Sequence, residues 1–485
     1  MKLSRIFNNA PDVDIKGLYT DSRKVKKGGM FFCLDGLVTN GHRFIEQAIA
    51  NGAICIVHSE PIEHYDDHVI YIKVEDVVKV LNQACSKFYD FPSEKMLVFG
   101  ITGTNGKSTV ANIIKEIYGH FAKCGYIGTI AIEYDDIVLP PDLTTPDPVL
   151  LNATLKDMVK KNVDVVALEV SSHGLEQRRV ESIDFDIAIF TNFTYDHLDY
   201  HGTMENYFKA KCKLFENMKS DGLSILNIDD PKFAELYPLT NTEKVVTYGI
   251  EKEATYRAKN IRLQVDSTEF TLVYKECEYS IKTNLVAQYN VYNLLAAIAA
   301  IVESGIDIEK VLPYVSQIRQ VPGRIEMIHE GQPFQVIVDF AHTPDGLEKI
   351  YTFAKAITPP GGEIIAVFGS AGKRDKAKRE VFGSVSDQYC DFIILTEDDP
   401  RDENPEDIAQ EIRKGIKNTK NMIVTDRYGA IRLAIESANP NDTILLLGKG
   451  DETFMYHEEG RVPWIGDDQA VRQIIHRNYF NERED

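Results

Sequence analysis

Six consecutive residues have the types and spacing of a phosphate-binding loop: Gly103, Thr104, Asn105, Gly106, Lys107 and Ser108. A buried-strand pattern precedes them, and apolar residues at 110, 113, 114 and 117 predict a helix after them. A strand, a glycine-rich turn and a helix N-terminus in this order aim backbone N–H groups at an anion. Lys107 would reach the outer phosphates of a nucleoside triphosphate, and Ser108 could ligate Mg2+. Ile101 stands where the standard loop has its first glycine, so the sequence predicts a shorter variant of that loop.

Two further groups of polar residues follow apolar strands and indicate a metal site. Glu169 ends the run 165–168, and Asp196 and His197 follow a strand predicted to end at 192. Parallel strands bring their carboxyl ends to one sheet edge, where the phosphate loop also lies. Mg2+ prefers oxygen ligands and keeps substrate phosphates in its shell, so one carboxylate, one imidazole and Ser108 would suffice. The structural alternatives are a solvated strand end for Glu169 and a helix cap for Asp196.

Composition narrows the class of protein. The chain has 485 residues, of which 44% are hydrophobic and 26% charged, which is typical of a globular protein with about three domains. A net charge of −20 argues against a nucleic-acid partner and against binding to a membrane surface. No apolar run reaches the roughly 18 residues of a spanning helix, so we expect no membrane insertion. Seven scattered cysteines without a C-x-x-C pair predict reduced thiols and a cytoplasmic location.

Two breaks in the pattern divide the chain into three predicted domains, 1–93, 94–321 and 322–485. The first break is the turn 91–93 and the second is the turn 321–324. The predicted strands are 52–57, 163–170, 187–192, 336–339, 364–368, 392–396 and 443–447, and a helix is predicted over 294–302. Alternation of strands and helices predicts an α/β fold with mostly parallel sheets.

Separated motifs along essentially the whole chain make it resemble the Mur ligases. They lie at 20–23, 103–108, 144–147, 168–175, 196–202, 210–211, 290–293, 323–324, 339–345, 398–401 and 448–450. The resemblance implies three α/β domains. These are a small mixed α/β N-terminal UDP-binding domain, a central P-loop ATPase-like domain with a parallel sheet, and a C-terminal Rossmann-like domain that binds an amino acid.

The resemblance also implies a reaction, ATP-dependent amide formation through an acyl phosphate. The positions that match the family's ATP site are Gly103, Thr104, Asn105, Gly106, Lys107, Ser108, Thr109, Asn293, Arg324 and Asp339. Ser108, Glu169 and His197 match ligands of two Mg2+ ions, and Lys107, Glu169, His197 and Lys211 match the catalytic set. The lysine that matches Lys211 is carbamylated in the family, and N6-carboxylysine would replace a repelling ammonium by an anionic oxygen ligand. From composition alone, Lys211 would be an exposed helix lysine.

The resemblance also implies that the acceptor is UDP-N-acetylmuramoyl-L-alanyl-D-glutamate. Ser22 and the loop 36–42, with His42, resemble the family's UDP site. The positions that match the muramoyl-dipeptide site are Thr144, Thr145, Asp147, Ser171 and Arg179. Hydroxyls and a guanidinium suit a pyrophosphate and a carboxylated peptide. The structural alternatives are a proline turn at 144–147 and a surface arginine, and Arg178 leaves open which arginine points inward.

The added amino acid is expected to bind at 396–401. The positions that match the family's meso-diaminopimelate site are Arg374, Asp398, Asp399, Pro400, Arg401, Gly448 and Glu452. Arg401 could hold a carboxylate bidentately and would repel an ammonium. Asp399 departs from the asparagine of the diaminopimelate motif, and it could draw an ammonium or neutralise Arg401. We favour meso-diaminopimelate, with L-lysine as the alternative.

The chain also departs from the family pattern at several positions, and two other classes of protein remain as alternatives. The family's tyrosine after Asp339 is Phe340 here, and Gln288 and Tyr289 replace its common glycine and phenylalanine, so those roles are not transferred. A folylpolyglutamate-type ligase would share the phosphate loop but would not need 144–147 or the N-terminal domain. A non-catalytic nucleotide-binding subunit would not need Lys107, Glu169, His197 and Lys211 together. We expect the protein to be a monomer that binds small-molecule substrates and closes its domains around them.

Overall fold

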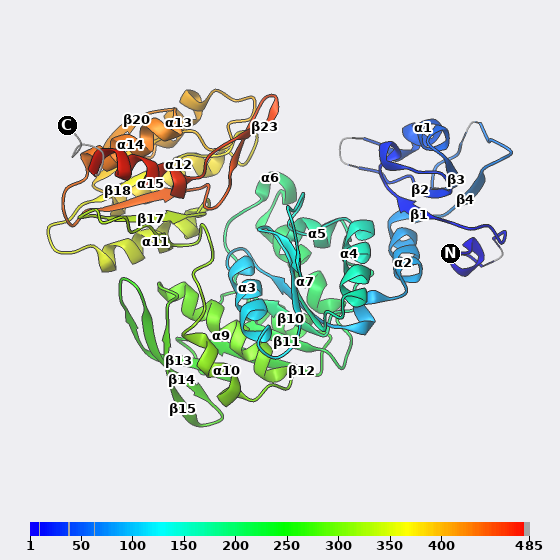
Figure 1. Ribbon diagram of the computed structural model, residues 1–485, viewed down its shortest axis with the longest axis horizontal. Coiled ribbons are helices and arrows are strands. Elements are labelled where there is room, and N and C mark those ends of the chain that lie inside the picture. The colour runs from blue at the N-terminus through cyan, green and yellow to red at the C-terminus, as the bar shows by residue number, and fades with distance from the viewer. Residues whose placement is uncertain (9, 37–38, 63, 480–485) are drawn as a thin grey trace.

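The computed structural model describes residues 1–8, 10–36, 39–62 and 64–479. Three sheets in these residues build three α/β parts, and Figure 1 shows the central part lying between the N-terminal part, in blue, and the C-terminal part, in yellow to red. This is the three-part α/β architecture that the sequence predicted. No helix in the described ranges combines the length and the apolar character needed to cross a membrane.

The N-terminal part is a small parallel sheet covered by helices. Its strands, in sheet order, are β1 (Gly17–Tyr19), β2 (Gly29–Phe32), β3 (Ala53–His58) and β4 (Ile70–Lys73), with helices α1 (Ile45–Ala50) and α2 (Val77–Tyr89). The predicted strand at 52–57 is confirmed as β3. Helix α2 ends at Asp90 and Phe91, which both adopt left-handed backbone conformations with φ of 65° and 48°, and the short turn Pro92–Lys95 follows. The predicted break at 91–93 is therefore a sharp change of chain direction.

The central part is built on an eleven-stranded sheet. Its strands are, in sheet order, β15 (Cys277–Thr283), β14 (Thr268–Tyr274), β13 (Tyr256–Leu263), β12 (Lys244–Gly249), β11 (Leu223–Asn227), β10 (Ile187–Phe190), β5 (Leu97–Thr102), β9 (Val165–Glu169), β6 (Cys124–Ile127), β7 (Ile132–Tyr134) and β8 (Ile137–Leu139). From β13 to β6 the neighbours pair in parallel, whereas β13–β14–β15 and β6–β7–β8 pair antiparallel. The parallel centre was predicted, and the antiparallel strands at both edges were not.

Helices cover both faces of this sheet. They are α3 (Lys107–Tyr118), α4 (Pro148–Lys160), α5 (Ser172–Glu176), α6 (Leu198–His201), α7 (Met204–Glu216), α8 (Phe233–Leu236), α9 (Gln288–Glu303) and α10 (Ile308–Val315). The predicted stripe on α3, Val110, Ile113, Ile114 and Ile117, is buried against α9. Burying four such side chains contributes on the order of 6–12 kcal/mol, which fixes α3 and therefore the loop at its N-terminus.

The C-terminal part is a six-stranded sheet. Its strands are, in sheet order, β16 (Glu326–Met327), β17 (Gln335–Asp339), β21 (Thr443–Leu447), β18 (Ile364–Phe368), β19 (Phe392–Leu395) and β20 (Lys420–Ile423). All neighbours are parallel except β16. The covering helices are α11 (Pro344–Ile357), α12 (Ala377–Tyr389), α13 (Pro405–Arg413), α14 (Arg427–Ser437) and α15 (Asp467–Tyr479), and β22 (Phe454–His457) and β23 (Gly460–Pro463) form a separate hairpin. The loops after β17, β19 and β21 all leave the carboxyl edge, where ligands bind in such sheets.

Candidate functional site

The predicted strand–loop–helix unit is present as β5, the loop 103–106 and α3. Gly106 precedes the helix at φ 89°, and no side chain caps the helix N-terminus. The first-turn N–H groups therefore have no intrahelical acceptor and are available to an anion. A Cβ at Gly103 would lie 1.8 Å from Thr191 Oγ1, so the loop backbone approaches its neighbours too closely for any other residue. This geometry suits phosphate groups.

Two lysines converge on the loop. Lys107 Nζ donates to Gly103 O at 3.1 Å and to Thr104 O at 2.9 Å. Lys211, on α7, is 2% exposed, and its Nζ donates to the same Gly103 O at 2.7 Å. Burial, with Lys107 close by, lowers the pKa of Lys211 well below its usual range. The exposed helix lysine that composition alone suggested is therefore excluded.

Glu169 is fully buried at the end of β9. Its Oε2 accepts a hydrogen bond from Ser108 Oγ at 2.9 Å. Its Oε1 accepts from the Tyr126 hydroxyl at 2.5 Å and from Thr129 N at 3.0 Å. A solvated strand end is therefore wrong for Glu169. A carboxylate and two hydroxyls beside the phosphate loop form the oxygen-rich donor set that Mg2+ prefers.

His197 and Asp196 lie at the same sheet edge. His197 has a left-handed backbone, φ 54°, and its Nε2 is 3.3 Å from Asp196 Oδ2. Burial lowers the pKa of His197 to about 2 in spite of the neighbouring carboxylate, so the ring is neutral, as a metal ligand must be. Asp196 Oδ1 accepts from His197 N at 2.9 Å, and Asp196 is not the cap of a helix, because the N-cap of α6 is His197 itself.

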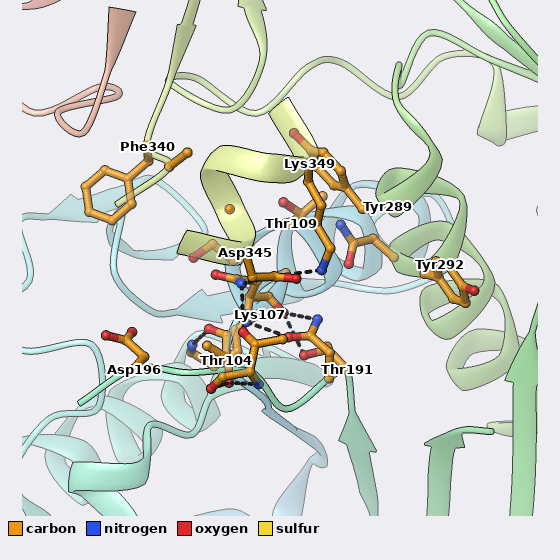
Figure 2. A pocket seen from close by; sticks show the side chains of 18 of the residues that line it. Thr104, Lys107, Thr109, Thr191, Asp196, Tyr289, Tyr292, Phe340, Asp345 and Lys349 are labelled. Atoms are coloured by element: carbon orange, nitrogen blue, oxygen red, sulfur yellow. Dashed lines mark hydrogen bonds and ion pairs between the residues drawn. The ribbon is translucent and has the colours of Figure 1, made fainter. Parts of the chain in front are cut away.

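A cavity of about 1050 Å³ opens beside these groups and runs between the central and C-terminal parts. Figure 2 shows Lys107 and Thr104 on one side and Asp345, Lys349 and Phe340 on the other. The predicted residues that line it are Thr104, Asn105, Gly106, Lys107, Ser108, Thr109, Thr144, Glu169, Ser171, Arg179, His197, Asn293, Arg324, Asp339 and Arg374. Its volume is at the upper end of the range for small-molecule and cofactor sites, roughly 300–1,000 Å³.

Two residues predicted for the muramoyl-dipeptide site have structural contacts instead of lining the cavity. Thr145 is fully buried and donates to Glu169 O at 2.8 Å. Asp147 caps α4 through the N–H groups of the two residues after Pro148. The open choice between the arginines is resolved by position, because Arg178 pairs with Asp76 and Glu181, whereas Arg179 lines the cavity and donates to Thr145 O.

At the far end of the cavity the predicted ATP residues come from two parts of the fold. The guanidinium carbon of Arg324 lies 4.3 Å from the ring centroid of Phe340, and its buried Nε has no hydrogen-bond partner in the described structure. Asp339 accepts from Ile325 N and Ala341 N, one on each oxygen. Asn293 packs against the loop, since its Oδ1 lies 2.3 Å from where a Cβ on Gly106 would stand. The orphaned Arg324 Nε marks a place for an acceptor on a ligand.

Direct contacts join the central and C-terminal parts around the cavity. Asn105 in the phosphate loop donates to Asp345 Oδ2 at 3.0 Å, and Tyr195 donates to Asp375 Oδ2 at 2.5 Å. Arg374 NH1 lies 3.6 Å from Asp199 Oδ2. The two parts therefore meet on either side of the cavity.

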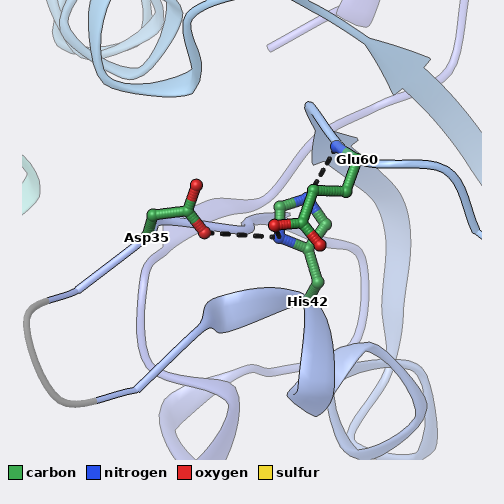
Figure 3. Close-up of side chains that lie close together, drawn as sticks. All are labelled: Asp35, His42 and Glu60. Atoms are coloured by element: carbon green, nitrogen blue, oxygen red, sulfur yellow. Dashed lines mark hydrogen bonds and ion pairs between the residues drawn. The ribbon is translucent and has the colours of Figure 1, made fainter.

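The predicted UDP residues lie in the N-terminal part, away from the cavity lining. Ser22 is buried and donates to Gln47 Oε1 at 2.7 Å. His42 lies beside Asp35 and Glu60, with candidate ligand atoms within 4.8 Å of one another (Figure 3). Its Nε2 accepts from two backbone N–H groups and its Nδ1 faces Asn40 Oδ1 at 2.7 Å, so both ring nitrogens are engaged. Residues 37 and 38 of the predicted loop lie outside the described residues.

The residues predicted to bind the amino acid form a cluster at the carboxyl edge of the C-terminal sheet. One alternative from the sequence, that Asp399 neutralises Arg401, is wrong. Asp399 Oδ1 accepts from Lys449 Nζ at 2.8 Å and from Tyr456 N at 3.0 Å. Lys449 also donates to Glu452 Oε2 at 2.5 Å. Asp399 and Arg401, on either side of Pro400, have φ of 48° and 56°, a strained backbone of the kind that clusters at functional sites.

Two more members complete this cluster. Asp398 is 8% exposed, and burial raises the pKa of its carboxyl group. Gly448 has φ 104°, and a Cβ there would lie 2.3 Å from Asp398 Oδ2, so only glycine fits. The cluster lies outside the lining of the large cavity, to which Arg374 alone of the predicted set belongs.

Sequence reasoning missed several residues that shape the site. Tyr126 donates a hydrogen bond to Glu169. Asp345 and Lys349 form an ion pair at 2.8 Å above the phosphate loop. Lys449 belongs to the motif 448–450, but sequence reasoning assigned it no role. A tyrosine within a buried strand was an available signal, because a buried hydroxyl needs a partner. Nothing local distinguished Lys349 from other helix lysines.

Comparison with known proteins gives consistent matches. The Mur ligase family, catalytic domain, matches residues 14–89, the Mur ligase middle domain 101–301, and the Mur ligase, glutamate ligase domain, 323–450. A UDP-N-acetylmuramoyl-L-alanyl-D-glutamate–2,6-diaminopimelate ligase 1 of Clostridium acetobutylicum is 40% identical over 465 residues, 94% of this chain and 95% of that protein.

Solved structures give the same result. A structure of a UDP-N-acetylmuramoyl-L-alanyl-D-glutamate–2,6-diaminopimelate ligase is similar with a TM-score of 0.70 and 29% identity, over 99% of both chains. The MurF ligase of Thermotoga maritima in complex with ADP has a TM-score of 0.67 at 17% identity, over 98% of this chain and 100% of that chain. At 17% identity, the similarity to the MurF ligase shows only that the two proteins share a fold.

Proposed function

The chain belongs to the Mur ligase family, and we propose that it joins meso-diaminopimelate to UDP-N-acetylmuramoyl-L-alanyl-D-glutamate with ATP, in peptidoglycan precursor synthesis. The observation that carries this proposal is an uncapped phosphate loop with Lys107, Glu169 and His197 around one cavity. The near full-length relatives named for 2,6-diaminopimelate favour that amino acid over L-lysine.

The proposed reaction begins with attack of the D-glutamate carboxylate on the γ-phosphorus of ATP. An oxygen–phosphorus bond forms, the bond to ADP breaks, and an acyl phosphate results. The amine of the amino acid then attacks the acyl carbon, and phosphate leaves with the carbon–oxygen bond electrons. Lys107 and the first-turn N–H groups of α3 would hold the phosphates, and Arg324, Asn293 and Asp339 would contact the rest of the nucleotide.

Ser108, Glu169 and His197 fit the two Mg2+ ions of the proposal. The hydroxyl and carboxylate are already 2.9 Å apart at the loop, and the imidazole is neutral because burial depresses its pKa. Bound Mg2+ would neutralise charge on the transferring phosphoryl group.

Lys211 supports a carbamate in this proposal. A neutral amine can attack CO2, and burial beside Lys107 favours the neutral form of Lys211 by lowering its pKa. The carbon–nitrogen bond forms as one carbon–oxygen π bond opens, and the amine loses a proton. N6-carboxylysine would then present an oxygen ligand toward the metal edge and place a negative charge close to Lys107.

The substrate sites of the proposal lie on all three domains, 1–93, 94–321 and 322–485. Ser22 and His42 would hold the UDP group, and Thr144, Ser171 and Arg179 the muramoyl-dipeptide. Thr145 and Asp147 support this site through the backbone. We also propose a monomer, because one chain carries every group named, and a cytoplasmic location, where ATP and the UDP-substrate are available.

Phosphate release tests the function. Purified protein is given ATP, Mg2+ and the UDP-dipeptide, with each candidate amino acid supplied singly. We expect release with meso-diaminopimelate and about tenfold or more less with L-lysine. Release with lysine alone would overturn the amino-acid assignment. If no candidate amino acid gives phosphate release, the ligase function is refuted and a non-catalytic subunit is supported. Phosphate release with folate and glutamate would support a folylpolyglutamate-type ligase.

A further inference from the structure

Lys449 lies at the centre of the amino-acid cluster and has no role in the proposed reaction so far. We propose that Lys449 is a positioning residue that sets the choice of amino acid: by occupying Asp399 and Glu452, it leaves Arg401 open for a distal carboxylate. The inference rests on the proposed function and concerns why a chain with Asp399 would accept a diamino acid that carries this extra carboxylate.

Lys449 is a buried lysine that pairs with two carboxylates. Its side chain is 0% exposed and bridges Asp399 Oδ1 at 2.8 Å and Glu452 Oε2 at 2.5 Å. These carboxylates belong to two different loops, one after β19 and one after β21. Burial lowers the pKa of Lys449, but the surrounding Asp398, Glu452 and Asp399 outweigh it and raise the pKa. The ammonium therefore stays charged.

Arg401 is left without an anionic partner by this arrangement. Its NH1 donates to Gly372 O at 2.6 Å and its N–H to Tyr456 O. No carboxylate in the described ranges lies within ion-pairing distance of its guanidinium. Two guanidinium nitrogens remain for a ligand, which is the fork geometry that binds a carboxylate bidentately.

The two carboxylates each keep one oxygen free. Within the described part of the chain, the hydrogen bonds of Asp399 use Oδ1 and those of Glu452 use Oε2. Asp399 Oδ2 and Glu452 Oε1 can therefore accept from a substrate ammonium.

Charge balance then distinguishes the two candidate amino acids. Asp398, Asp399 and Glu452 place carboxyl groups around Lys449, and Lys449 and Arg401 carry two positive charges, so the pocket displays both signs of charge. A pocket that displays both signs suits the distal end of diaminopimelate, which carries one ammonium and one carboxylate. Without Lys449 the pocket would be negative, and the distal end of lysine, which carries only an ammonium, would gain.

A purely structural role for Lys449 makes a different prediction. If Lys449 only joined the two loops, its loss would weaken use of both amino acids by the same factor. If it sets the charge of the pocket, its loss would change their ratio, and deleting one negative charge as well would restore that ratio.

The test compares Lys449→Met, Asp399→Asn/Lys449→Met and Lys420→Met with the wild type. For each protein, kcat/KM is measured for meso-diaminopimelate and for L-lysine. We expect the ratio of the two to fall about tenfold or more in Lys449→Met, since one unit charge a few ångströms away exceeds the about 1.4 kcal/mol of a tenfold change. The double variant should recover most of the ratio. Lys420→Met is the control for removing a lysine charge from the same domain, because Lys420 is exposed on β20, where its Nζ lies 4.6 Å from the Phe392 ring centroid.

An equal loss for both amino acids in Lys449→Met, or no recovery in the double variant, would overturn the inference. Thermal unfolding checks that each variant is folded. If Lys449→Met misfolds, Asp399→Asn/Lys449→Met is compared with the wild type instead, and the kcat/KM ratios of these two proteins should agree within about threefold. A wild type that uses neither amino acid would refute the proposed function before any variant is compared.

Discussion

Replacing Lys211 by alanine tests the centre of the proposed site. Lys211 Nζ and Lys107 Nζ donate to the same Gly103 O, at 2.7 and 3.1 Å, so the two nitrogens lie no more than about 5.8 Å apart. Two unit charges of opposite sign at this distance attract by about 3 kcal/mol at an effective dielectric constant of about 20. A carbamate on Lys211 would supply this attraction to Lys107, which a neutral amine does not. Losing about 3 kcal/mol from the transition state corresponds to about a hundredfold lower rate.

We therefore expect Lys211→Ala to lose about a hundredfold in kcat, measured as phosphate release at saturating substrates. Millimolar acetate or formate should restore part of the rate, because a small carboxylate can enter the space left by the side chain and supply the missing oxygen. Lys209→Ala is the matched control: Lys209 lies on the same helix, is exposed and pairs with Glu205. It should keep wild-type activity.

The result that refutes this reasoning is specific. If folded Lys211→Ala keeps its rate within about threefold of wild type, Lys211 is not a ligand. If the rate falls but no carboxylate restores it, whereas Lys209→Ala is normal, Lys211 acts as an amine and the carbamate is wrong.

Three more perturbations follow from distances and burial. Gly128→Ala would place a Cβ 2.1 Å from Glu169 Oε1, so Glu169 must move, and we expect the Mg2+ concentration for half-maximal phosphate release to rise about tenfold. Arg427→Met leaves the fully buried Asp467 unpaired and should lower the free energy of unfolding in urea by about 3–5 kcal/mol. Burial raises the pKa of Glu452 from 4.5 to about 7, so between these values the folded chain holds a proton that the unfolded chain has released. The free energy of unfolding of the wild type, relative to that of Glu452→Gln, should therefore fall by about 3 kcal/mol as pH rises from 4.5 to about 7. A difference between the two proteins that does not change with pH would contradict the raised pKa.

Parts of the fold that depend on local patterns could be predicted from the sequence. The strands at 364–368 and 443–447 match β18 and β21 residue for residue, and Asn404 caps α13 through Glu406 N as its sequence favours. The phosphate loop belongs to this class, since its glycines, its lysine and the apolar stripe of α3 are all within reach of one another along the chain. In such segments, propensity and burial act on the same residues.

Parts that depend on long-range contacts could not be predicted. β6–β7–β8 and β13–β14–β15 extend the sheet antiparallel, and pairing of this kind is decided by packing rather than by the alternation that indicates a parallel sheet. Asp399 shows the same limit at a single residue. Its neighbour Arg401 is the obvious partner in sequence, but Lys449, 50 residues away, takes its carboxylate.

In the proposed reaction the amino-acid cluster would supply the nucleophile from outside the large cavity, and the contacts between the central and C-terminal parts would hold it in place. Asn105 meets Asp345 across 240 residues of sequence, and Tyr195 meets Asp375 across 180. Both central residues belong to loops that carry proposed nucleotide or metal ligands. A ligand that orders these loops therefore acts directly on the docking of the C-terminal part. In the proposed reaction, ATP and its metals would thus hold the amino-acid cluster against the acyl phosphate only while the nucleotide is bound, which limits loss of that intermediate to water.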